Sequence, residues 1–327
     1  MSHVPATPTP RRAVLLDAET FSPADLDWSA LEAAVPELVR HGTTAPGEVV
    51  ARLAGAAIAI SNKVVLDAGV LAACPELKLV CVAATGTNNV DLAAAREHGI
   101  AVCNARGYGT PSVVQHTWAL ILALATRLPD YHAAVSRGDW ARASQFCLLD
   151  FPIAELAGRT LGIVGYGELG QAVAAVAPAF GMQVLVAQLP GRPAAEGRVP
   201  LAEVLARADV LSLHCPLTET TRGLIGAAEL ARMKPDALLI NTARGGIVDE
   251  AALAEALRGG RLGGAGVDVL GAEPPRDGNP LLAPDLPNLI VTPHTAWASR
   301  GARQRLVEQV AENIRTFGAG TPLRRVV

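Results

Sequence analysis

The 327-residue sequence has few of the features of a disulfide-rich, metal-binding or membrane protein. Its five cysteines are scattered and odd in number, and none forms a C-x-x-C pair, which predicts free thiols and neither a zinc site nor a disulfide framework. No segment reaches the roughly 18 uninterrupted apolar residues of a membrane span. The first twelve residues contain prolines and lack the apolar core of a signal peptide, which predicts a frayed tail. We therefore expect a cytoplasmic protein with no bound metal and no membrane partner.

The sequence also lacks a large excess of positive or negative charge. The formal net charge is −3, so composition gives no sign of a surface for nucleic acid or another polyanion. Half of the residues are hydrophobic, and the length is that of two ordinary domains. The composition is therefore that of a soluble chain with enough apolar side chains for two buried cores.

Short apolar runs alternate with helical patterns along most of the chain. Over residues 13–103 this alternation predicts a small parallel α/β domain, with one of its helices over residues 28–39. From Leu161 to Val291 six strands alternate with helices and predict one doubly wound parallel sheet. A closing helix is expected over residues 301–317, where apolar side chains recur at helical spacing.

The segment 160–181 reads as strand, glycine-rich turn and helix. Its turn is Gly165-Tyr166-Gly167-Glu168-Leu169-Gly170, the G-x-G-x-x-G pattern of dinucleotide-binding folds. In such sites the first glycine makes the turn, the second lets backbone approach a pyrophosphate, and the third lets helix and strand pack. The motif alone is weakly specific, and a glycine turn without a ligand is the alternative. Its position between a buried strand and a helix favours nucleotide binding.

Four polar side chains stand at or just beyond strand ends: His214, Arg244, Asp268 and His294. Ligands of doubly wound sheets bind at the carboxyl ends of strands. Reduction of a carbonyl by a nicotinamide requires a proton donor, which an imidazole supplies near neutral pH, and a cation, for which a guanidinium matches a carboxylate. Glu273, 21 residues before His294, is placed to hydrogen-bond that imidazole. Taken singly, each residue could be a core histidine, a surface arginine or a loop carboxylate; their shared position favours catalysis.

These residues lie in motifs through which the chain resembles the D-isomer-specific 2-hydroxyacid dehydrogenase family, and most closely its glycerate dehydrogenase/hydroxypyruvate reductase branch. The resemblance extends over nearly the full length. Its seven ordered stretches are Ala83–Asp91, Gly165–Gly170, Leu213–Thr218, Asn241–Gly246, Gly266–Val269, Glu273–Pro274 and Thr292–Trp297.

The resemblance implies two Rossmann-like domains with an α/β fold. A doubly wound nucleotide domain, residues 109–298, is inserted into a smaller flavodoxin-like substrate domain made of residues 1–108 plus 299–327. It also implies a cleft between the domains that closes over substrate, and a homodimer in which the nucleotide domains and the segment 129–152 make the contact.

The resemblance also implies roles for individual residues. Arg244, Glu273 and His294 are the expected catalytic residues. Asn62, Lys63, Thr85 and Gly86 are expected to bind substrate together with Arg244 and His294. The cofactor-binding residues are expected to be Thr110, Gly165, Tyr166, Gly167, Glu168, Leu169, Gly170, Gln188, His214, Cys215, Pro216, Thr221, Thr242, Ala243, Arg244, Asp268, His294 and Ala296.

The choice between NAD and NADP is open in the sequence. Folds that prefer NAD place an acidic residue on the ribose about 20 residues past the glycines, but this chain has Gln188 there. Gln188 carries no charge to repel a 2′-phosphate, and Arg192 is placed to pair with one. We expect dual or NADP-tolerant use.

The expected activity is reversible hydride transfer between NAD(P)H and a small 2-oxo acid, giving a D-2-hydroxy acid, with hydroxypyruvate and glyoxylate as the expected substrates. The alternatives are a non-enzymatic NAD(H)-binding sensor like the corepressors built on this scaffold, and a phosphite dehydrogenase. His41, His98, His116 and His132 have no acidic or cysteine partners at metal-ligand spacing, and we assign them no role.

Overall fold

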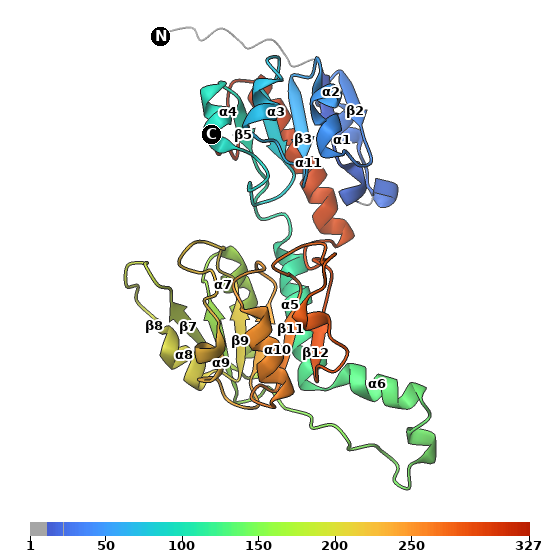
Figure 1. Cartoon of the computed structure of the whole chain (residues 1–327), viewed down its shortest axis with the longest axis vertical. Helices are drawn as coiled ribbons and strands as arrows, with labels where there is room; N and C mark the ends of the chain where they lie inside the picture. The colour runs from blue at the N-terminus through green and yellow to red at the C-terminus, as the bar shows by residue number, and fades with distance from the viewer. Residues whose placement is uncertain (1–11, 22) are drawn as a thin grey trace. The chain divides into compact units, whose positions relative to one another are not determined.

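The computed structural model of the chain describes residues 12–21 and 23–327, so most of the expected N-terminal tail lies outside the described residues. The chain divides into two compact units, each with its own sheet and core (Figure 1). One unit comprises Met1–Gly109 and Ala298–Val327, and the other comprises Thr110–Trp297. Both units are α/β with parallel sheets, as the sequence predicts.

The sheet of the first unit is five-stranded and parallel, in the order β2-β1-β3-β4-β5. This 2-1-3-4-5 order is that of flavodoxin-like folds. The chain's last helix, α11, packs on this sheet, although the other elements of the unit come from the first third of the chain (Figure 1). The strands are β1 (Arg12–Leu15), β2 (Glu37–Arg40), β3 (Ile58–Ser61), β4 (Leu79–Val82) and β5 (Ala101–Cys103). The α-helices are α1 (Ser29–Glu32), α2 (Val49–Leu53), α3 (Ala68–Ala72), α4 (Leu92–Glu97) and α11 (Arg300–Gly318).

The helix predicted over residues 28–39 is wrong beyond its first turn. Helix α1 ends at Glu32, and residues Glu37–Arg40 form the edge strand β2. The physical reason is Pro36, which has no N–H to donate and keeps Val35 out of the α region. Apolar side chains at helical spacing therefore belong here to a short helix followed by a strand.

The second unit contains a seven-stranded parallel sheet in the order β12-β11-β10-β9-β6-β7-β8. Counted within the unit this is the 3-2-1-4-5-6 order of dinucleotide-binding folds with one further strand. The prediction of six strands missed β8, a three-residue edge strand that ends in Pro200 and carries no apolar run. The strands are β6 (Thr160–Val164), β7 (Gln183–Gln188), β8 (Arg198–Pro200), β9 (Val210–Leu213), β10 (Leu238–Asn241), β11 (Gly264–Val267) and β12 (Leu289–Val291).

Helices cover both faces of this sheet. On one face α5 and α7 pack against β6, β9 and β10 through side chains such as Ile121, Val173 and Ile163. On the other face α8, α9 and α10 pack through Leu205 and Leu257. Within the described residues no helix is long and apolar enough to cross a membrane. The helices are α5 (Thr110–Ala125), α6 (Leu128–Ser136), α7 (Glu168–Ala174), α8 (Leu201–Arg207), α9 (Ala227–Leu230) and α10 (Glu250–Arg258).

Candidate active site

The glycine turn lies at the point where the strand order of the second unit reverses, between β6 and β9. Gly165 has φ +97°, and a Cβ there would stand 2.5 Å from the Cys215 backbone nitrogen. A Cβ on Gly170 would stand 2.0 Å from the Gly165 carbonyl oxygen, so only glycine allows α7 to pack this close to the turn. Gly167 faces open space, since a Cβ at this position would meet no atom within 4 Å. The three glycines thus leave room for a ligand above the middle one.

His214 and Cys215 follow β9 and stand beside the glycine turn. The His214 Nε2 atom is 2.8 Å from the Ser212 hydroxyl, and burial lowers the pKa of His214 from 6.5 to about 4. Burial raises the pKa of the Cys215 thiol to about 11. Both side chains are therefore neutral near pH 7 and add no charge to the crevice. The Pro216 carbonyl accepts a hydrogen bond of 2.6 Å from the Thr221 hydroxyl, which closes the turn after the strand.

Gln188 ends β7, and its amide nitrogen is held by the following loop. Its Nε2 donates to the carbonyls of Leu189, Arg192 and Pro193 at 3.3, 3.0 and 3.0 Å. The Oε1 atom of Gln188 is buried without a hydrogen-bond partner, and so is Nδ1 of His214. Unpaired buried polar atoms are uncommon and indicate an absent partner. Together with the open space at Gly167, the residues present fit a dinucleotide.

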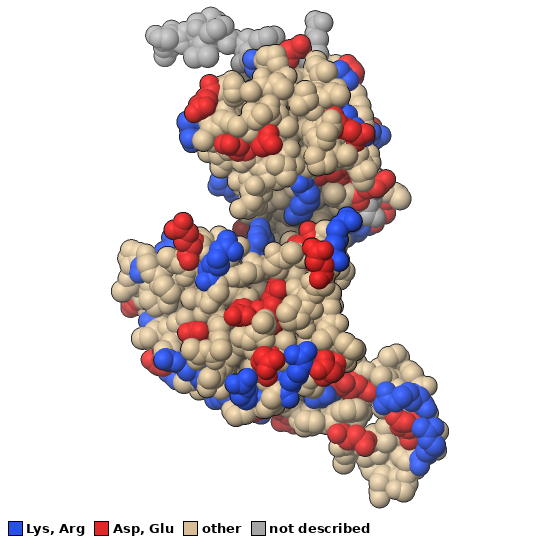
Figure 2. Space-filling model, in the orientation of Figure 1, with Lys and Arg blue, Asp and Glu red and all other residues tan. Residues whose placement is uncertain are grey.

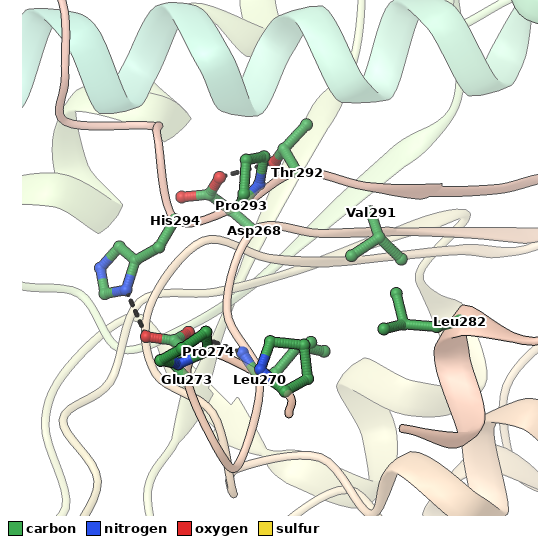
Figure 3. Close-up of a pocket in the computed structure, with 10 residues that line it drawn as sticks. Asp268, Leu270, Glu273, Pro274, Leu282, Val291, Thr292, Pro293 and His294 are labelled. Carbon is green, nitrogen blue, oxygen red and sulfur yellow. Dashed lines mark hydrogen bonds and ion pairs between the residues drawn. The ribbon is translucent and has the colours of Figure 1, made fainter. Parts of the chain in front are cut away.

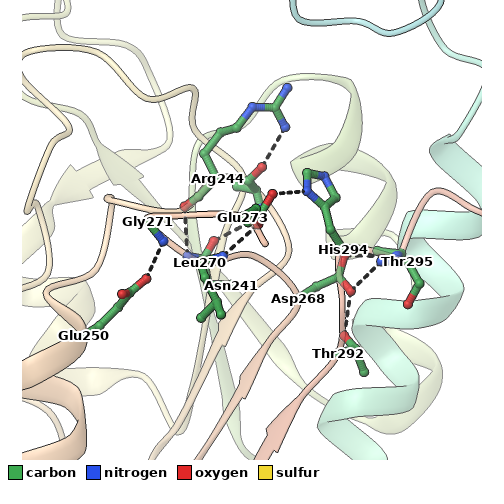
Figure 4. A network of polar contacts seen from close by, with 12 residues as sticks. Asn241, Arg244, Glu250, Asp268, Leu270, Gly271, Glu273, Thr292, His294 and Thr295 are labelled. Carbon is green, nitrogen blue, oxygen red and sulfur yellow. Dashed lines mark hydrogen bonds and ion pairs between the residues drawn. The ribbon is translucent and has the colours of Figure 1, made fainter. Parts of the chain in front are cut away.

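The turn after β10 carries the expected substrate-binding arginine. Asn241 accepts a hydrogen bond from the Ala243 backbone N–H at 3.1 Å and donates to the Arg244 carbonyl at 3.0 Å. The exposed Arg244 side chain donates from Nη1 to the Ala243 carbonyl at 2.8 Å. The buried Thr242 hydroxyl lies 2.9 Å from that of Thr117 on α5. Asn241 therefore sets the backbone from which the guanidinium projects (Figure 4).

His294 and Glu273 come together in the structure. The Nδ1 atom of His294 lies 2.6 Å from Glu273 Oε2, while Glu273 Oε1 accepts from the Leu270 N–H at 2.8 Å. Both side chains are about one-third exposed. With Nδ1 engaged by the carboxylate, Nε2 is the imidazole atom turned away from the pair (Figure 3).

Asp268, at the end of β11, is 1 % exposed and holds the loop that carries His294. Its carboxylate accepts hydrogen bonds from the backbone N–H groups of Thr295 and Ala296, each at 2.9 Å, and from the Thr292 hydroxyl at 2.5 Å. Its carbonyl accepts from the His294 N–H at 2.8 Å. His294 itself adopts φ +55°, a conformation uncommon outside glycine. Asp268 thus fixes the backbone on both sides of His294 (Figure 4).

An apolar pocket of about 370 Å³ adjoins this pair within the second unit. Leu270, Leu282 and Val291 line it, and Glu273 and His294 form part of its wall (Figure 3). The carboxylate–imidazole pair therefore stands at the edge of an apolar pocket.

The expected substrate residues of the first unit follow two neighbouring strands. Asn62 and Lys63 come directly after β3, and Thr85 and Gly86 lie just beyond the paired strand β4. The buried carboxylate of Asp17 accepts backbone hydrogen bonds from Asn62 at 3.0 Å and from Lys63 at 2.6 Å. This turn stands where the strand order of the first unit reverses, between β1 and β3.

The remaining expected cofactor residues also lie in the second unit. Tyr166 and Glu168 both belong to the glycine turn, and Glu168 accepts a hydrogen bond from the Thr110 hydroxyl at 2.5 Å. Leu169 begins α7 together with Glu168, and Ala296 is buried beside Asp268. Among the described residues no group of three or more His, Cys, Asp or Glu side chains is arranged to hold a metal ion.

Two polar residues in these networks were not singled out from the sequence. Asp17 ends the first apolar run, so an acid at a strand end was the available signal. His116 lies on α5, with Nε2 2.9 Å from the Thr292 hydroxyl. No sequence pattern could point to it, because its partners are 152 and 176 residues further along the chain, at Asp268 and Thr292.

The fold and the strand-end residues define a dinucleotide-dependent oxidoreductase with a histidine–carboxylate pair. The family model described as D-isomer specific 2-hydroxyacid dehydrogenase, NAD binding domain, matches residues 118–296. The chain is 48 % identical over 314 residues to a glycerate dehydrogenase of Methylorubrum extorquens, covering 95 % of this chain and 98 % of the relative. It is 38 % identical over 321 residues to a hydroxypyruvate reductase of Blautia hydrogenotrophica, covering 96 % and 99 %.

A solved Thermus thermophilus protein superposes with a TM-score of 0.85 at 38 % identity, covering 97 % of this chain and 100 % of that one. The chain belongs to the D-isomer specific 2-hydroxyacid dehydrogenase family. It is therefore an enzyme of the NAD(P)-dependent D-2-hydroxyacid dehydrogenase class, and the family predicted from its motifs is confirmed.

Proposed function

We propose that the enzyme reduces hydroxypyruvate and glyoxylate to the corresponding hydroxy acids, with His294 as proton donor. The observation that carries the proposal is the 2.6 Å contact between His294 Nδ1 and Glu273 Oε2. A carboxylate on one ring nitrogen orients the imidazole, so that the other nitrogen presents a proton to substrate. The names of two relatives, glycerate dehydrogenase and hydroxypyruvate reductase, support these substrates.

Arg244 binds the substrate's carboxylate and carbonyl oxygen. Its guanidinium is exposed, and Asn241 fixes the backbone from which it extends. A planar cation suits a 2-oxo acid because it engages two oxygens at once, and its attraction grows as negative charge develops on the carbonyl oxygen. His294 then transfers a proton from Nε2 to that oxygen. The bound nicotinamide supplies the hydride.

The first unit supplies further substrate contacts. Asn62 and Lys63 follow the strand at which the order of the sheet reverses, the position where doubly wound sheets bind ligands. Asp17 fixes their backbone with hydrogen bonds to both N–H groups. Thr85 and Gly86 present backbone N–H groups to the substrate carboxylate.

The test is a panel of 2-oxo acids with NADH and NADPH, followed by His294→Ala. Hydroxypyruvate and glyoxylate should give the highest kcat/KM. His294→Ala should lower kcat at least about 100-fold, the usual contribution of a general acid, and change the cofactor Kd less than about threefold. Equal losses of kcat and cofactor affinity would contradict the role of His294. Tight cofactor binding without turnover of any 2-oxo acid would instead indicate a sensor.

The enzyme accepts both NADH and NADPH. Gln188 keeps Oε1 for the ribose hydroxyl and adds no negative charge, while the loop after it places the exposed Arg192 nearby. Among the described residues Arg192 forms no ion pair, so its guanidinium is available to a 2′-phosphate. Because Gln188 Nε2 is already engaged by three carbonyls, Arg192 is the residue that discriminates.

Arg192→Gln should therefore raise KM for NADPH about tenfold, the cost of one charge-assisted contact, and leave KM for NADH unchanged. Arg96→Gln, an exposed arginine of the first unit, is the matched control and should change neither. An enzyme inactive with NADPH, or a variant that loses both cofactors equally, would refute dual use through Arg192.

The enzyme is a cytoplasmic homodimer that assembles through the arm formed by residues 128–153, one residue longer at each end than the segment 129–152 expected from the resemblance. All five cysteines are free, as expected in a reducing compartment. Of the eleven large apolar side chains exposed among the described residues, six lie in this arm. These six are Leu128, Val135, Trp140, Phe146, Leu149 and Ile153.

The arm is ordered by its own contacts. The Tyr131 hydroxyl donates to the Phe151 carbonyl at 2.7 Å, and the Trp140 indole donates to the Phe146 carbonyl at 2.9 Å. In Figure 1 α6 and the chain after it extend away from the sheet of their own unit. An ordered segment with exposed aromatic side chains is best covered by a second copy of the same surface.

A further inference from the structure

His116 lies on α5, and the proposed reaction leaves it without a role. Its Nε2 atom is 2.9 Å from the Thr292 hydroxyl oxygen and 3.5 Å from Asp268 Oδ1. The Thr292 hydroxyl is 2.5 Å from that same carboxylate oxygen. Side chains from α5 and from the ends of β11 and β12 therefore meet at one carboxylate, which is 1 % exposed.

The direction of each hydrogen bond follows from what the groups can donate. The Asp268 carboxylate accepts backbone N–H groups on both of its oxygens. The Thr292 hydroxyl has a single proton, and its closest partner is this acceptor at 2.5 Å, so it donates to Asp268. Only lone pairs of the hydroxyl are then left for the imidazole. His116 must carry its hydrogen on Nε2.

The same carboxylate controls the loop that carries His294. Thr295 and Ala296 donate their N–H groups to it, and the His294 N–H donates to the Asp268 carbonyl. His294 adopts φ +55°, a conformation that is unfavourable for a residue with a side chain and persists only where surrounding contacts impose it. A carboxylate free to rotate would release two of those contacts.

We propose that His116 is a positioning residue for His294. Its Nε2–H holds the Thr292 hydroxyl, the hydroxyl holds the Asp268 carboxylate, and the carboxylate keeps the loop in the conformation that aims the His294 ring at Glu273. The inference rests on the proposed function in that His294 is the proton donor there. His116 acts through these residues and does not contact substrate.

The kinetic test compares His116→Leu, which removes the donor at similar bulk, with His116→Gln, which retains an N–H donor. The expected result is a loss of kcat of about tenfold or more in the leucine variant, because small displacements of a catalytic group are costly. The glutamine variant should recover kcat to within about threefold of the parent at the same thermal midpoint as the leucine variant. Equal kcat in the two variants would overturn the proposal.

Thr292→Val tests the connection between His116 and Asp268. Combined with His116→Leu it should lower kcat no further than the single variants, because each removes the same chain of hydrogen bonds. Multiplied losses in the double variant would overturn the proposal. His98→Leu, at an exposed histidine directly after α4, is the matched control and should leave kcat unchanged.

A spectroscopic measurement separates this inference from the proposed function. In protein labelled with ¹⁵N-histidine, the signal missing from His116→Gln identifies the His116 ring. Its nitrogen shifts should show the Nε2-protonated tautomer, and Thr292→Val should alter them. The Nδ1-protonated tautomer would overturn the inference even in a fully active enzyme. If the parent reduces no 2-oxo acid, the proposed function fails while the tautomer still decides the role of the Nε2–H.

Discussion

At the scale of single residues, burial keeps His214 and Cys215 uncharged beside the glycine turn. His214 directly follows β9 beside the glycine turn, and burial lowers its pKa from 6.5 to about 4. Its only described polar partner is the Ser212 hydroxyl, so the buried ring has no carboxylate to stabilise a positive charge. A neutral ring suits a site for a dinucleotide, because it neither traps nor repels the phosphates as pH changes near neutrality.

The same burial predicts a loss of stability in acid. Above pH 6.5 His214 is neutral in both the folded and unfolded states, so it contributes no pH dependence. As pH falls from 6.5 toward 4, the unfolded state binds a proton that the folded state does not, and stability is lost. The total loss is about 3 kcal/mol, of which about 2 kcal/mol is lost by pH 5.

His214→Gln should abolish this part of the acid sensitivity. Urea unfolding of the cofactor-free protein at pH 7.5 and pH 5 measures the free energy of unfolding of parent and variant. The difference between the two pH values should be smaller in the variant by about 2 kcal/mol. Identical pH dependence in both proteins would show that His214 takes up its proton in the folded state.

At the scale of elements, two glycines of the glycine turn are required for different reasons, one for the packing of the fold and the other for the approach of a ligand. Gly170 is needed because a Cβ would stand 2.0 Å from the Gly165 carbonyl oxygen. Gly167 has φ −85°, which any residue adopts, and a Cβ there would meet no atom within 4 Å. The fold itself therefore requires glycine at one of these positions and not at the other.

Alanine should lower stability at Gly170 and cofactor affinity at Gly167. Gly170→Ala should lower the free energy of unfolding by about 1–3 kcal/mol or more, because backbone must shift. Gly167→Ala should change it by less than about 0.5 kcal/mol while raising the Kd of the dinucleotide at least tenfold, since the methyl group occupies the pyrophosphate approach. Gly47→Ala, also without a close neighbour, is the control for a surface glycine. Unchanged cofactor affinity in Gly167→Ala would place the pyrophosphate elsewhere.

The sequence predicted the strands that form continuous apolar runs. It failed at an edge strand without such a run and at a helix that a proline interrupts. Strands such as β6 and β9 are continuous apolar runs, and they were predicted because parallel strands are buried on both faces. The strand β8 has no such run, and at the edge of the sheet it pairs with β7 alone. The error over residues 28–39 has a local cause, since Pro36 interrupts an otherwise helical pattern.

The residues of the candidate site also fall into those that the sequence could suggest and those that it could not. Motifs around Arg244 and His294 are contiguous in sequence, so a family resemblance could assign them roles, which remain predictions. The network behind His294 could not be read from the chain. His116 and Asp268 are 152 residues apart, and only the packing of α5 on the sheet brings them within 3.5 Å. Side chains that support a site from other elements leave no spacing signal.

At the scale of the whole molecule, one compact unit is built from two segments that are far apart in the sequence. Helix α11, near the end of the chain, packs in the first unit. In sequence, the second unit is inserted between the two pieces of the first unit. Each unit has a complete sheet with its own strand-order reversal, at which the Asn62–Lys63 turn stands in the first unit and the glycine turn in the second. Figure 2 shows acidic and basic side chains interspersed over the visible face of each unit. The arm is the part of the second unit whose large apolar side chains lie exposed and do not pack into the core of that unit.

The exposed apolar side chains of the arm predict a dimer. Phe146 is 88 % exposed and Leu149 is 83 % exposed, an extent that a monomer in water gains nothing from. A stable interface buries about 1,200–2,000 Å² in total and is anchored by buried aromatic side chains, the role expected of Trp140 and Phe146. The parent protein should therefore have a mass in solution of twice 33.8 kDa.

Phe146→Asp combined with Leu149→Asp should convert the dimer to a monomer, because each charge would be buried without a partner at the interface. Light scattering coupled to size-exclusion chromatography measures the mass, and far-ultraviolet circular dichroism shows whether the two units keep their fold. Val65→Asp, at a side chain 60 % exposed in the first unit, is the matched control and should remain dimeric. A parent protein that is monomeric at micromolar concentration would refute the arm-mediated dimer. A dimer that survives both substitutions would place the interface on another surface.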